Sequence, residues 1–297
     1  MSTSHHAQQG LAVINALVIV IATSLIAVSL LEKQSQQTER LIAEHERSQA
    51  VWLLQGGLDW VQLLLRIDAR HTPITNRSGL LAQRIQNMPI ETVDGTDSAL
   101  FSGYLEDEQA KFNLLRLVEG EQIQAKQIAQ LEELLTWIDL PRSLAQSLAE
   151  QLSGSYQPSI NKTPQQIAGR RPTELIATAQ LNVTQQERLN SYCTLLPPHS
   201  KLNVNTAPAE VLAATIQGLS LTEAVNLVKE RDQGNWFMST SQFLHHLSDA
   251  DNDTLKKIDI KSSWFLVHGE IQRGVTHVRQ QALLHRQPNQ TTVVWSL

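Results

Sequence analysis

The sequence has almost no cysteine. Cys193 is the only one among 297 residues. A single thiol excludes an internal disulfide and any zinc site built on several cysteines. The folded body must therefore be stabilised by packing.

The chain also lacks an excess of positive charge. It carries 24 Lys and Arg against 29 Asp and Glu, a net charge of −5, and its pI is about 6.1. Binding to nucleic acid or to an anionic membrane surface usually needs a basic patch, so the composition favours neither. The length allows two domains. A mean hydropathy of −0.21 with 41% hydrophobic residues predicts a soluble globular body.

Sequence motifs of the common enzyme classes are missing. There is no G-x-S-x-G, H-E-x-x-H, P-loop or G-x-G-x-x-G. No residue stands where a neighbouring base would make it a nucleophile. We therefore predict a non-enzyme, and a membrane-anchored hydrolase is a disfavoured alternative.

One acidic stretch partly matches a calcium-binding loop. Asp249, Asp251 and Asp253 fall at the spacing of the first three ligands of such a loop. Thr254 stands where the turn needs Gly, and Ile260 where a bidentate Glu is needed, so this is not an EF-hand. An irregular calcium site and a polar loop both remain open, and the polar loop is favoured. No cofactor is predicted.

Charge is absent from residues 11–31, and the ten residues before them contain no Lys or Arg. A secretory signal needs only about 7–15 apolar residues, whereas a helix that spans a membrane needs about 20. Two cleavage sites compete. Ala27-Val28-Ser29 has the small-x-small form that signal peptidase reads, and Gly10 stands directly before the apolar run. We favour a cut at Gly10 that leaves the helix on the mature chain.

The helix is predicted to continue beyond the apolar run. Residues 32–46 are polar and contain neither Gly nor Pro. An apolar stripe at helical spacing follows, made of Leu53, Trp60, Leu64 and Ile67, joined by Trp52 and Leu63. The stripe predicts one face buried against strands, and the helix should end near His71-Thr72-Pro73.

The rest of the chain predicts strands on both sides of a helical block. β-branched and aromatic residues indicate strands at 99–105, 112–118, 264–271, 275–284 and 291–295. The acidic residues 106–108 between the first two are interpreted as a polar loop. Helices are predicted at 122–135, 143–152, 185–192, 208–216 and 222–231, with a further helical start at 172–177. Because strands flank the helices, we expect an α+β fold with a helical insertion.

Three stretches together resemble a known family. They are the Gly10/Leu11 junction with its apolar helix, the stretch LNVNTAPAEVL at residues 202–212, and the terminal strands. The chain resembles the K minor pseudopilins of type II secretion (general secretion pathway protein K) over nearly its whole length. The resemblance implies an α+β fold, in which a long N-terminal helix packs on an antiparallel sheet with a large inserted all-α (SAM-like or helix-hairpin-helix-like) domain. The implied division is a leader at 1–10, a transmembrane part at 11–31, a pilin-like domain at 32–118 and 260–297, and the insertion at 119–259.

The resemblance also implies how the chain matures. In this family prepilin peptidase cuts after the leader Gly, here Gly10, and methylates the new N-terminus, here Leu11. Most pilin-like subunits carry Glu at the fifth mature position, and the K subunit usually lacks it. That position is Asn15 here. A carboxylate in lipid is costly unless it is paired, and a subunit at the tip has no predecessor to pair with. Family leaders are commonly basic, and this one is not.

As expectations, the resemblance implies a subunit at the pseudopilus tip that initiates assembly and supports export of folded proteins across the outer membrane. The implied partners are the minor pseudopilins I and J, through them H and the major pseudopilin G, and prepilin peptidase. The implied location is the Gram-negative inner membrane, with a single span and a periplasmic body. The alternative is a membrane-anchored DNA-uptake protein with a helix-hairpin-helix module. Residues 217–220 offer such a hairpin only one glycine and no adjacent base, so no nucleic-acid partner is predicted.

Overall fold

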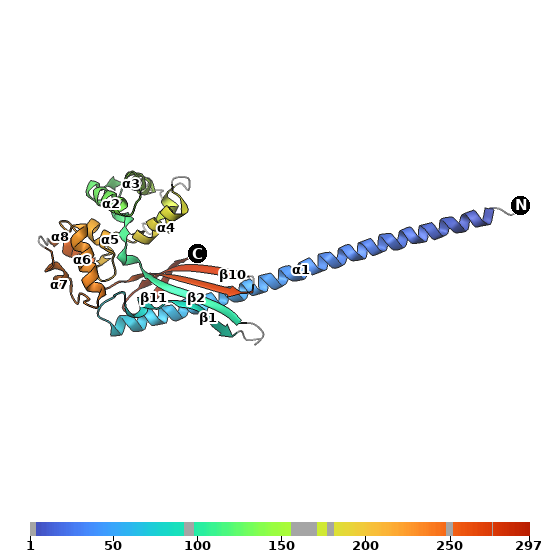
Figure 1. The fold of residues 1–297 in the computed structure, drawn as a ribbon, viewed down its shortest axis with the longest axis horizontal. Helices are drawn as coiled ribbons and strands as arrows, with labels where there is room; N and C mark the ends of the chain where they lie inside the picture. The colour runs from blue at the N-terminus through green and yellow to red at the C-terminus, as the bar shows by residue number, and fades with distance from the viewer. Residues whose placement is uncertain (1–3, 92–97, 156–170, 177–180, 248–251, 275) are drawn as a thin grey trace.

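The computed structural model describes residues 4–91, 98–155, 171–176, 181–247, 252–274 and 276–297. A single long helix leads from the N-terminus to a body in which a sheet and a group of shorter helices lie at the opposite end of the molecule (Figure 1).

Helix α1 spans Ser4–His71 and is 68 residues long. Its end at His71 confirms the predicted break. The Thr72 hydroxyl donates to the Asp68 carbonyl at the last turn, and Arg70 and His71 place basic groups where the helix dipole is negative. The N-terminal half of α1 extends away from the body, and the C-terminal half packs on the sheet (Figure 1).

One antiparallel sheet of five strands covers the second half of α1. Its order is β1-β2-β9-β10-β11. The strands are β1 Ile85–Glu91, β2 Ser98–Asp107, β9 Trp264–Arg273, β10 Thr276–Arg286 and β11 Thr291–Ser296. The predicted strands at 99–105, 264–271, 275–284 and 291–295 are confirmed, while β1 was not predicted. Pro89 weakens the strand signal of this stretch in the sequence. In the structure, Pro89 and the positive φ of Asn87 (49°) suit β1 to the edge of the sheet.

The predicted strand at 112–118 is wrong. The structure has only the two-residue strands β3 Phe112–Asn113 and β4 Val118–Glu119, with the 3-10 helix η3 Leu114–Leu117 between them. The Asn113 side chain accepts from the Leu115 amide and so bends the chain. The apolar residues of this stretch are buried in the helical region rather than in the sheet.

Between β2 and β9 the chain forms a region of short helices, residues 112–259, called the helical region below. Its α-helices are α2 Ala125–Trp137, α3 Leu144–Ser155, α4 Val183–Tyr192, α5 Ala209–Thr215, α6 Leu221–Asp232, α7 Thr240–Leu244 and α8 Asn252–Lys257. The predictions for α2 to α6 are confirmed, and α7 and α8 were too short to be predicted. The helical start at 172–177 is a 3-10 turn, η4 Pro172–Leu175. The remaining elements are η1 Gly79–Ala82, η2 Glu108–Ala110, β5 Gln122–Ile123, β6 Cys193–Thr194, β7 Leu202–Asn203 and β8 Ile258–Asp259.

The face of α1 that meets the sheet differs from the predicted one. Leu54, Leu58 and Leu65 are buried, at 3%, 4% and 1% exposure, whereas Trp60 is 49% exposed. The three buried leucines are spaced i, i+4 and i+11 and so lie on one face of α1. This apolar face is narrower than the predicted one, which included Trp52 and Trp60. The sheet accepts them closely because Gly269 stands beneath α1, where a Cβ would lie 2.9 Å from the Leu54 side chain.

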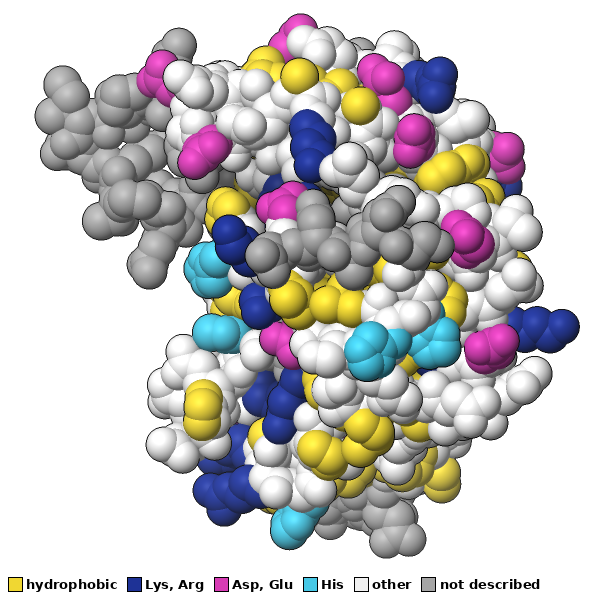
Figure 2. All heavy atoms as spheres, turned by 90° about the vertical axis from the view of Figure 1, so that its left-hand side faces the viewer, with side chains coloured by type: hydrophobic (Ala, Val, Ile, Leu, Met, Phe, Trp, Pro, Cys, Tyr) yellow, Lys and Arg dark blue, Asp and Glu magenta, His cyan; other side chains and the backbone are white. Residues whose placement is uncertain are grey.

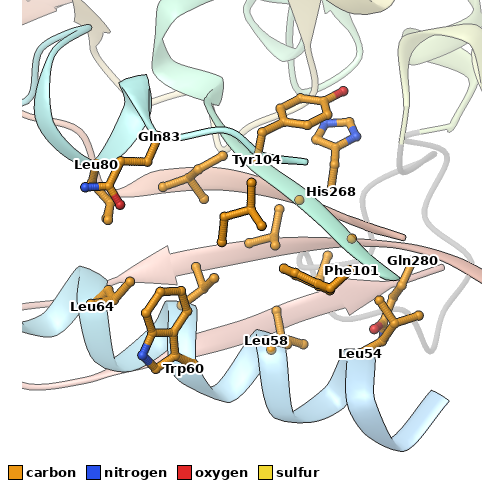
Figure 3. A pocket seen from close by; sticks show the side chains of 18 residues that line it. Leu54, Leu58, Trp60, Leu64, Leu80, Gln83, Phe101, Tyr104, His268 and Gln280 are labelled. Carbon is orange, nitrogen blue, oxygen red and sulfur yellow. The ribbon is translucent and has the colours of Figure 1, made fainter. Parts of the chain in front are cut away.

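Figure 3 shows how this contact is built. Leu54, Leu58, Trp60 and Leu64 rise from α1 toward Phe101, while Leu80 and Gln83 close one side. A small apolar cavity of about 60 Å³ remains among these side chains. Tyr104 and His268 point away from α1, toward the helical region (Figure 3).

Candidate functional site

The N-terminal half of α1 is the first functional feature. Its apolar side chains lie open to solvent, as Leu25 (66% exposed) and Leu31 (65%) illustrate. Among the described residues, α1 is the one helix long and apolar enough to cross a membrane, with a mean hydropathy of 2.1 in its most apolar window. Two of its hydroxyls are satisfied within the helix: Thr23 donates to the Ile19 carbonyl at 2.9 Å and Ser29 to that of Ile26 at 2.8 Å. Such bonds lower the cost of hydroxyls in lipid.

The residues predicted for maturation lie along this helix. Gly10 and Leu11 belong to the backbone of α1, and the Leu11 side chain is not among the described ones. Asn15 is exposed on the same helix. It is an uncharged side chain within an apolar surface, which is compatible with a membrane segment.

Of the three calcium candidates, Asp249 and Asp251 lie outside the described residues. Asp253 lies on α8, where its Oδ2 is 2.6 Å from the ammonium of Lys257 and 3.7 Å from that of Lys126. Among the residues that the structure describes, no group of three His, Cys, Asp or Glu side chains could hold a metal ion.

The α5–α6 hairpin has the shape of a phosphate-binding turn but not its chemistry. Gly218 adopts a φ of 81° in the turn, and α6 begins at Leu221 after the N-cap residue Ser220. Ser220 caps α6, and its amide and hydroxyl both donate to the Glu223 carboxylate, at 2.9 and 2.6 Å. A carboxylate therefore occupies the helix end that a phosphate would need.

The second functional feature is a group of polar side chains where the helical region meets the sheet. This polar junction consists of Thr75, Asp107, Asn203, Thr206, Ser262 and Arg286, all of which are buried. They come from five separate stretches: the loop after α1, the end of β2, β7 with the loop after it, the segment before β9, and the end of β10.

Asp107 is the centre of the polar junction. Its Oδ2 accepts from the hydroxyls of Thr206 (2.5 Å) and Ser262 (2.6 Å) and from the Asn203 amide (3.1 Å). Its Oδ1 accepts from the Gln109 backbone amide at 2.9 Å. Burial raises the pKa of Asp107, and these hydrogen bonds oppose that effect. Because the donors come from both sides, the carboxylate ties the helical region to the sheet.

Arg286 extends the junction to the end of α1. Its guanidinium donates to the Asp68 carboxylate at 2.7 Å, to the Thr75 hydroxyl at 2.9 Å and to the Ser262 carbonyl at 2.6 Å. It also lies 4.7 Å from the centre of the Phe265 ring. The arginine thus fixes the position of the loop after α1 relative to β10.

The loop after β7 is held from behind by a buried arginine. Arg231 on α6 is 1% exposed and donates to the carbonyls of Val204 (2.9 Å) and Ala207 (2.6 Å). Asn205 exchanges two hydrogen bonds with the Phe237 backbone, at 2.8 and 2.9 Å. The repeated asparagines at 203 and 205 therefore act in opposite directions, one toward the sheet and one into the helical region.

The acidic residues 106–108 are not the polar loop that was predicted. Asp107 and Glu108 are each only 6% exposed. Lys111 donates to Glu108 at 2.5 Å and to Glu106 at 3.0 Å, and Thr194 donates to Glu108 at 2.5 Å. Burial would raise the pKa of Glu106, but its contacts with His268 and Lys111 outweigh burial and lower it to about 2. Sequence alone gave no signal for these distant partners.

Comparison with known proteins identifies what these features resemble. Residues 202–261 match the family model described as Type II secretion system (T2SS), protein K. This stretch contains the loop after β7 and one side of the polar junction. The chain is 24% identical to the type II secretion system protein K of Pseudomonas aeruginosa over 291 residues, which cover 90% of this chain and 85% of that protein. It is also 24% identical to the protein K of Klebsiella pneumoniae over 318 residues, covering 95% and 94%.

A solved structure shares the fold. It is the GspK-GspI-GspJ complex of the enterotoxigenic Escherichia coli type 2 secretion system, which aligns with a TM-score of 0.61 at 20% identity. The alignment covers 87% of this chain and 98% of that chain. The shared fold includes the long N-terminal helix, the antiparallel sheet and the further helices.

Proposed function

Because the chain belongs to the protein K family of type II secretion pseudopilins, we propose that it caps the tip of a pseudopilus and initiates its assembly. In this role it supports the export of folded proteins across the outer membrane. Its apolar helix is anchored in the inner membrane, and the body lies in the periplasm. The chain acts by assembly rather than by catalysis.

The observation that carries this proposal is the position of the helical region. It lies at the end of the molecule farthest from the N-terminus, beyond the sheet (Figure 1). Figure 2 shows this end of the molecule face-on, with charged and apolar side chains both at its surface. Pilin-like fibres grow by heterologous contacts, in which each subunit offers one surface upward and another downward. A large body on the upper end obstructs a subunit stacked there, so such a chain can begin a fibre but does not fit inside one.

Asn15 supports the same position independently. In the proposed maturation, prepilin peptidase cuts after Gly10 and methylates Leu11, so Asn15 becomes the fifth residue. Without a carboxylate at this place, the helix does not attract the amino terminus of a neighbouring subunit within the membrane. A first subunit has no need of that attraction.

The proposed partners are the minor pseudopilins I and J, and through them H and the major pseudopilin G. The solved relative is a complex of GspK with GspI and GspJ, and the shared fold makes corresponding partners reasonable for this chain. We also propose the division into a pilin-like domain, 32–118 and 260–297, with the insertion at 119–259.

A DNA-uptake role is less well supported. The Glu223 carboxylate occupies the end of α6 that would face a phosphate, and the net charge is −5. Both features oppose binding to a polyanion. Retention on DNA at low salt would favour that role over the one proposed.

The initiation step is tested by counting fibres. Cells that overproduce the major pseudopilin should form several-fold fewer pseudopili when this chain is absent, and the wild-type chain should restore the number. Gly10→Ala should fail to restore it, because the leader stays attached. Mass spectrometry of the extracted protein shows whether Leu11 is the N-terminus. An unchanged number of fibres without the chain would contradict initiation.

A further inference from the structure

The helical region and the sheet have separate hydrophobic cores. The core of the helical region contains residues between Phe112 and Ile258. The two cores beneath the sheet contain residues of α1, β2, β9 and β10. Within the described part of the chain these three cores share no residue. The two bodies are therefore joined by polar contacts. Besides the polar junction, these include the contacts of Arg77 with the Thr206 carbonyl (2.9 Å) and the Asp232 carboxylate (3.6 Å), and the hydrogen bond from Thr194 to Glu108 (2.5 Å).

On one side of the junction the two bodies stand apart. An open cleft of about 960 Å³ lies between them. One wall is the face of the sheet turned away from α1, where Tyr104 and His268 project (Figure 3). The other wall includes Arg171, next to η4, and Glu187 on α4.

The two walls carry opposite charges, and among the described residues those named here form no ion pair with one another across the cleft. Arg84 and Glu270 lie on the sheet wall, and Glu187 and Arg171 lie on the wall of the helical region. Arg84 is held over the Tyr104 ring, 4.8 Å from its centre, so its charge stays at the cleft. Among the described residues, no ion pair joins Arg171 or Glu187 to a strand of the sheet.

The other charged groups in the cleft are already partnered within their own wall. Arg279 lies 3.3 Å from Glu270, His277 lies 3.5 Å from Glu270, and Lys111 is bound to Glu106 and Glu108. Glu106 also lies 3.6 Å from His268. On the wall of the helical region, Glu187 and Arg171 are therefore the charges that would gain the most electrostatic attraction if that wall approached the sheet.

From these features we infer that the helical region turns about the polar junction and closes over the outer face of the sheet. Closure brings Glu187 toward Arg84 and Arg171 toward Glu270. The junction is the fixed end of this movement, because its buried bonds to Asp107 hold the two bodies together beside Glu106 and Glu108, which line the cleft. Exposed pairs of this kind are worth about 0.2–1 kcal/mol each, so open and closed forms should coexist.

The test is a distance measurement on the full-length chain in detergent. Spin labels are placed at Met88→Cys on β1 and Thr184→Cys on α4, both exposed. Cys193 is fully buried, and burial raises its pKa to about 12, so it stays unlabelled. A second pair, Met88→Cys with Thr292→Cys, lies within the sheet and should show one distance under all conditions.

We expect two distances for the first pair, with the shorter one favoured at low salt. The ratio of short to long should fall about two- to fivefold when Glu187 becomes Lys, and Arg84→Glu in the same chain should restore it. Glu150→Lys on α3, away from the cleft, is the matched control and should leave the ratio unchanged. A single distance would overturn the inference. So would two distances whose ratio does not change with salt or with Glu187→Lys. Neither outcome depends on whether the chain caps a fibre.

Discussion

At the scale of single residues, the centre of this molecule is one buried carboxylate. Asp107 gathers donors from the loop after β7, from the segment before β9 and from its own turn. The sequence shows it only as the middle of three acidic residues, a pattern that usually indicates a solvated loop. The three side chains that donate to it lie between 96 and 155 residues away along the chain, and no local spacing can reveal them.

Replacing Asp107 by Asn should destabilise the fold strongly. The amide would present donors to the hydroxyls and the side-chain amide that now donate to the carboxylate. We expect a loss of about 2–4 kcal/mol in the free energy of unfolding, measured by urea denaturation of a soluble fragment beginning at Thr38. Asp139→Asn is the control, because Asp139 is exposed and Asn tolerates its positive φ of 55°. Equal stability of the two variants would show that the junction carries little energy.

The lowered pKa of Glu106 predicts an acid-sensitive contribution to stability. The pKa of Glu106 in the folded protein, about 2, lies below the ordinary value of 4.5. A carboxyl whose pKa is lowered by folding stabilises the protein above the unfolded pKa, and this stabilisation is lost as the pH falls toward the folded value. Glu106→Gln should therefore lower the melting midpoint at pH 6 and have a smaller effect near pH 3. The exposed Glu121→Gln serves as control. An effect of Glu106→Gln that is equal at both values would contradict the assignment.

At the scale of elements, α1 shows what an apolar pattern can and cannot predict. The helix, its length and its end near His71 follow from the sequence, because composition and the Thr72-Pro73 break are local signals. The buried face does not. Trp52 and Trp60 dominate the pattern by size, yet they are 76% and 49% exposed. The smaller leucines are buried instead. The glycines of the sheet let α1 approach closely, and this close approach leaves no room for an indole between the helix and the sheet.

This difference gives a direct comparison of two substitutions on one helix. Leu58→Ala should cost about 2–5 kcal/mol, because Leu58 is 4% exposed against the sheet. Trp60→Ala should cost less than Leu58→Ala, although tryptophan is the larger side chain. The measurement is urea denaturation of the same soluble fragment. The reverse order would mean that Trp60 and not Leu58 belongs to the core.

At the scale of the whole molecule, much of the architecture could be read from the sequence. The apolar run before a polar helix, the strands on both sides of a helical block and the stretch at 202–212 together resemble one family, and the comparisons bear that out. The separation of the helical region from the sheet by a cleft could not be read. This separation depends on contacts between residues that are far apart in the sequence, and no local sequence pattern indicates those contacts.

The central claim is that this chain sits at the end of a fibre, because the helical region obstructs the upper surface. Isolated pseudopili containing the chain with a gold label on its exposed α3 test this directly by electron microscopy. The account predicts label at one end of each fibre. It also predicts that replacing residues 119–257 by a Gly/Ser linker allows internal label, provided that the remaining body folds. Asn15→Glu should increase internal label only if the missing charge is the stronger barrier. Wild-type label distributed evenly along the shaft would contradict the account.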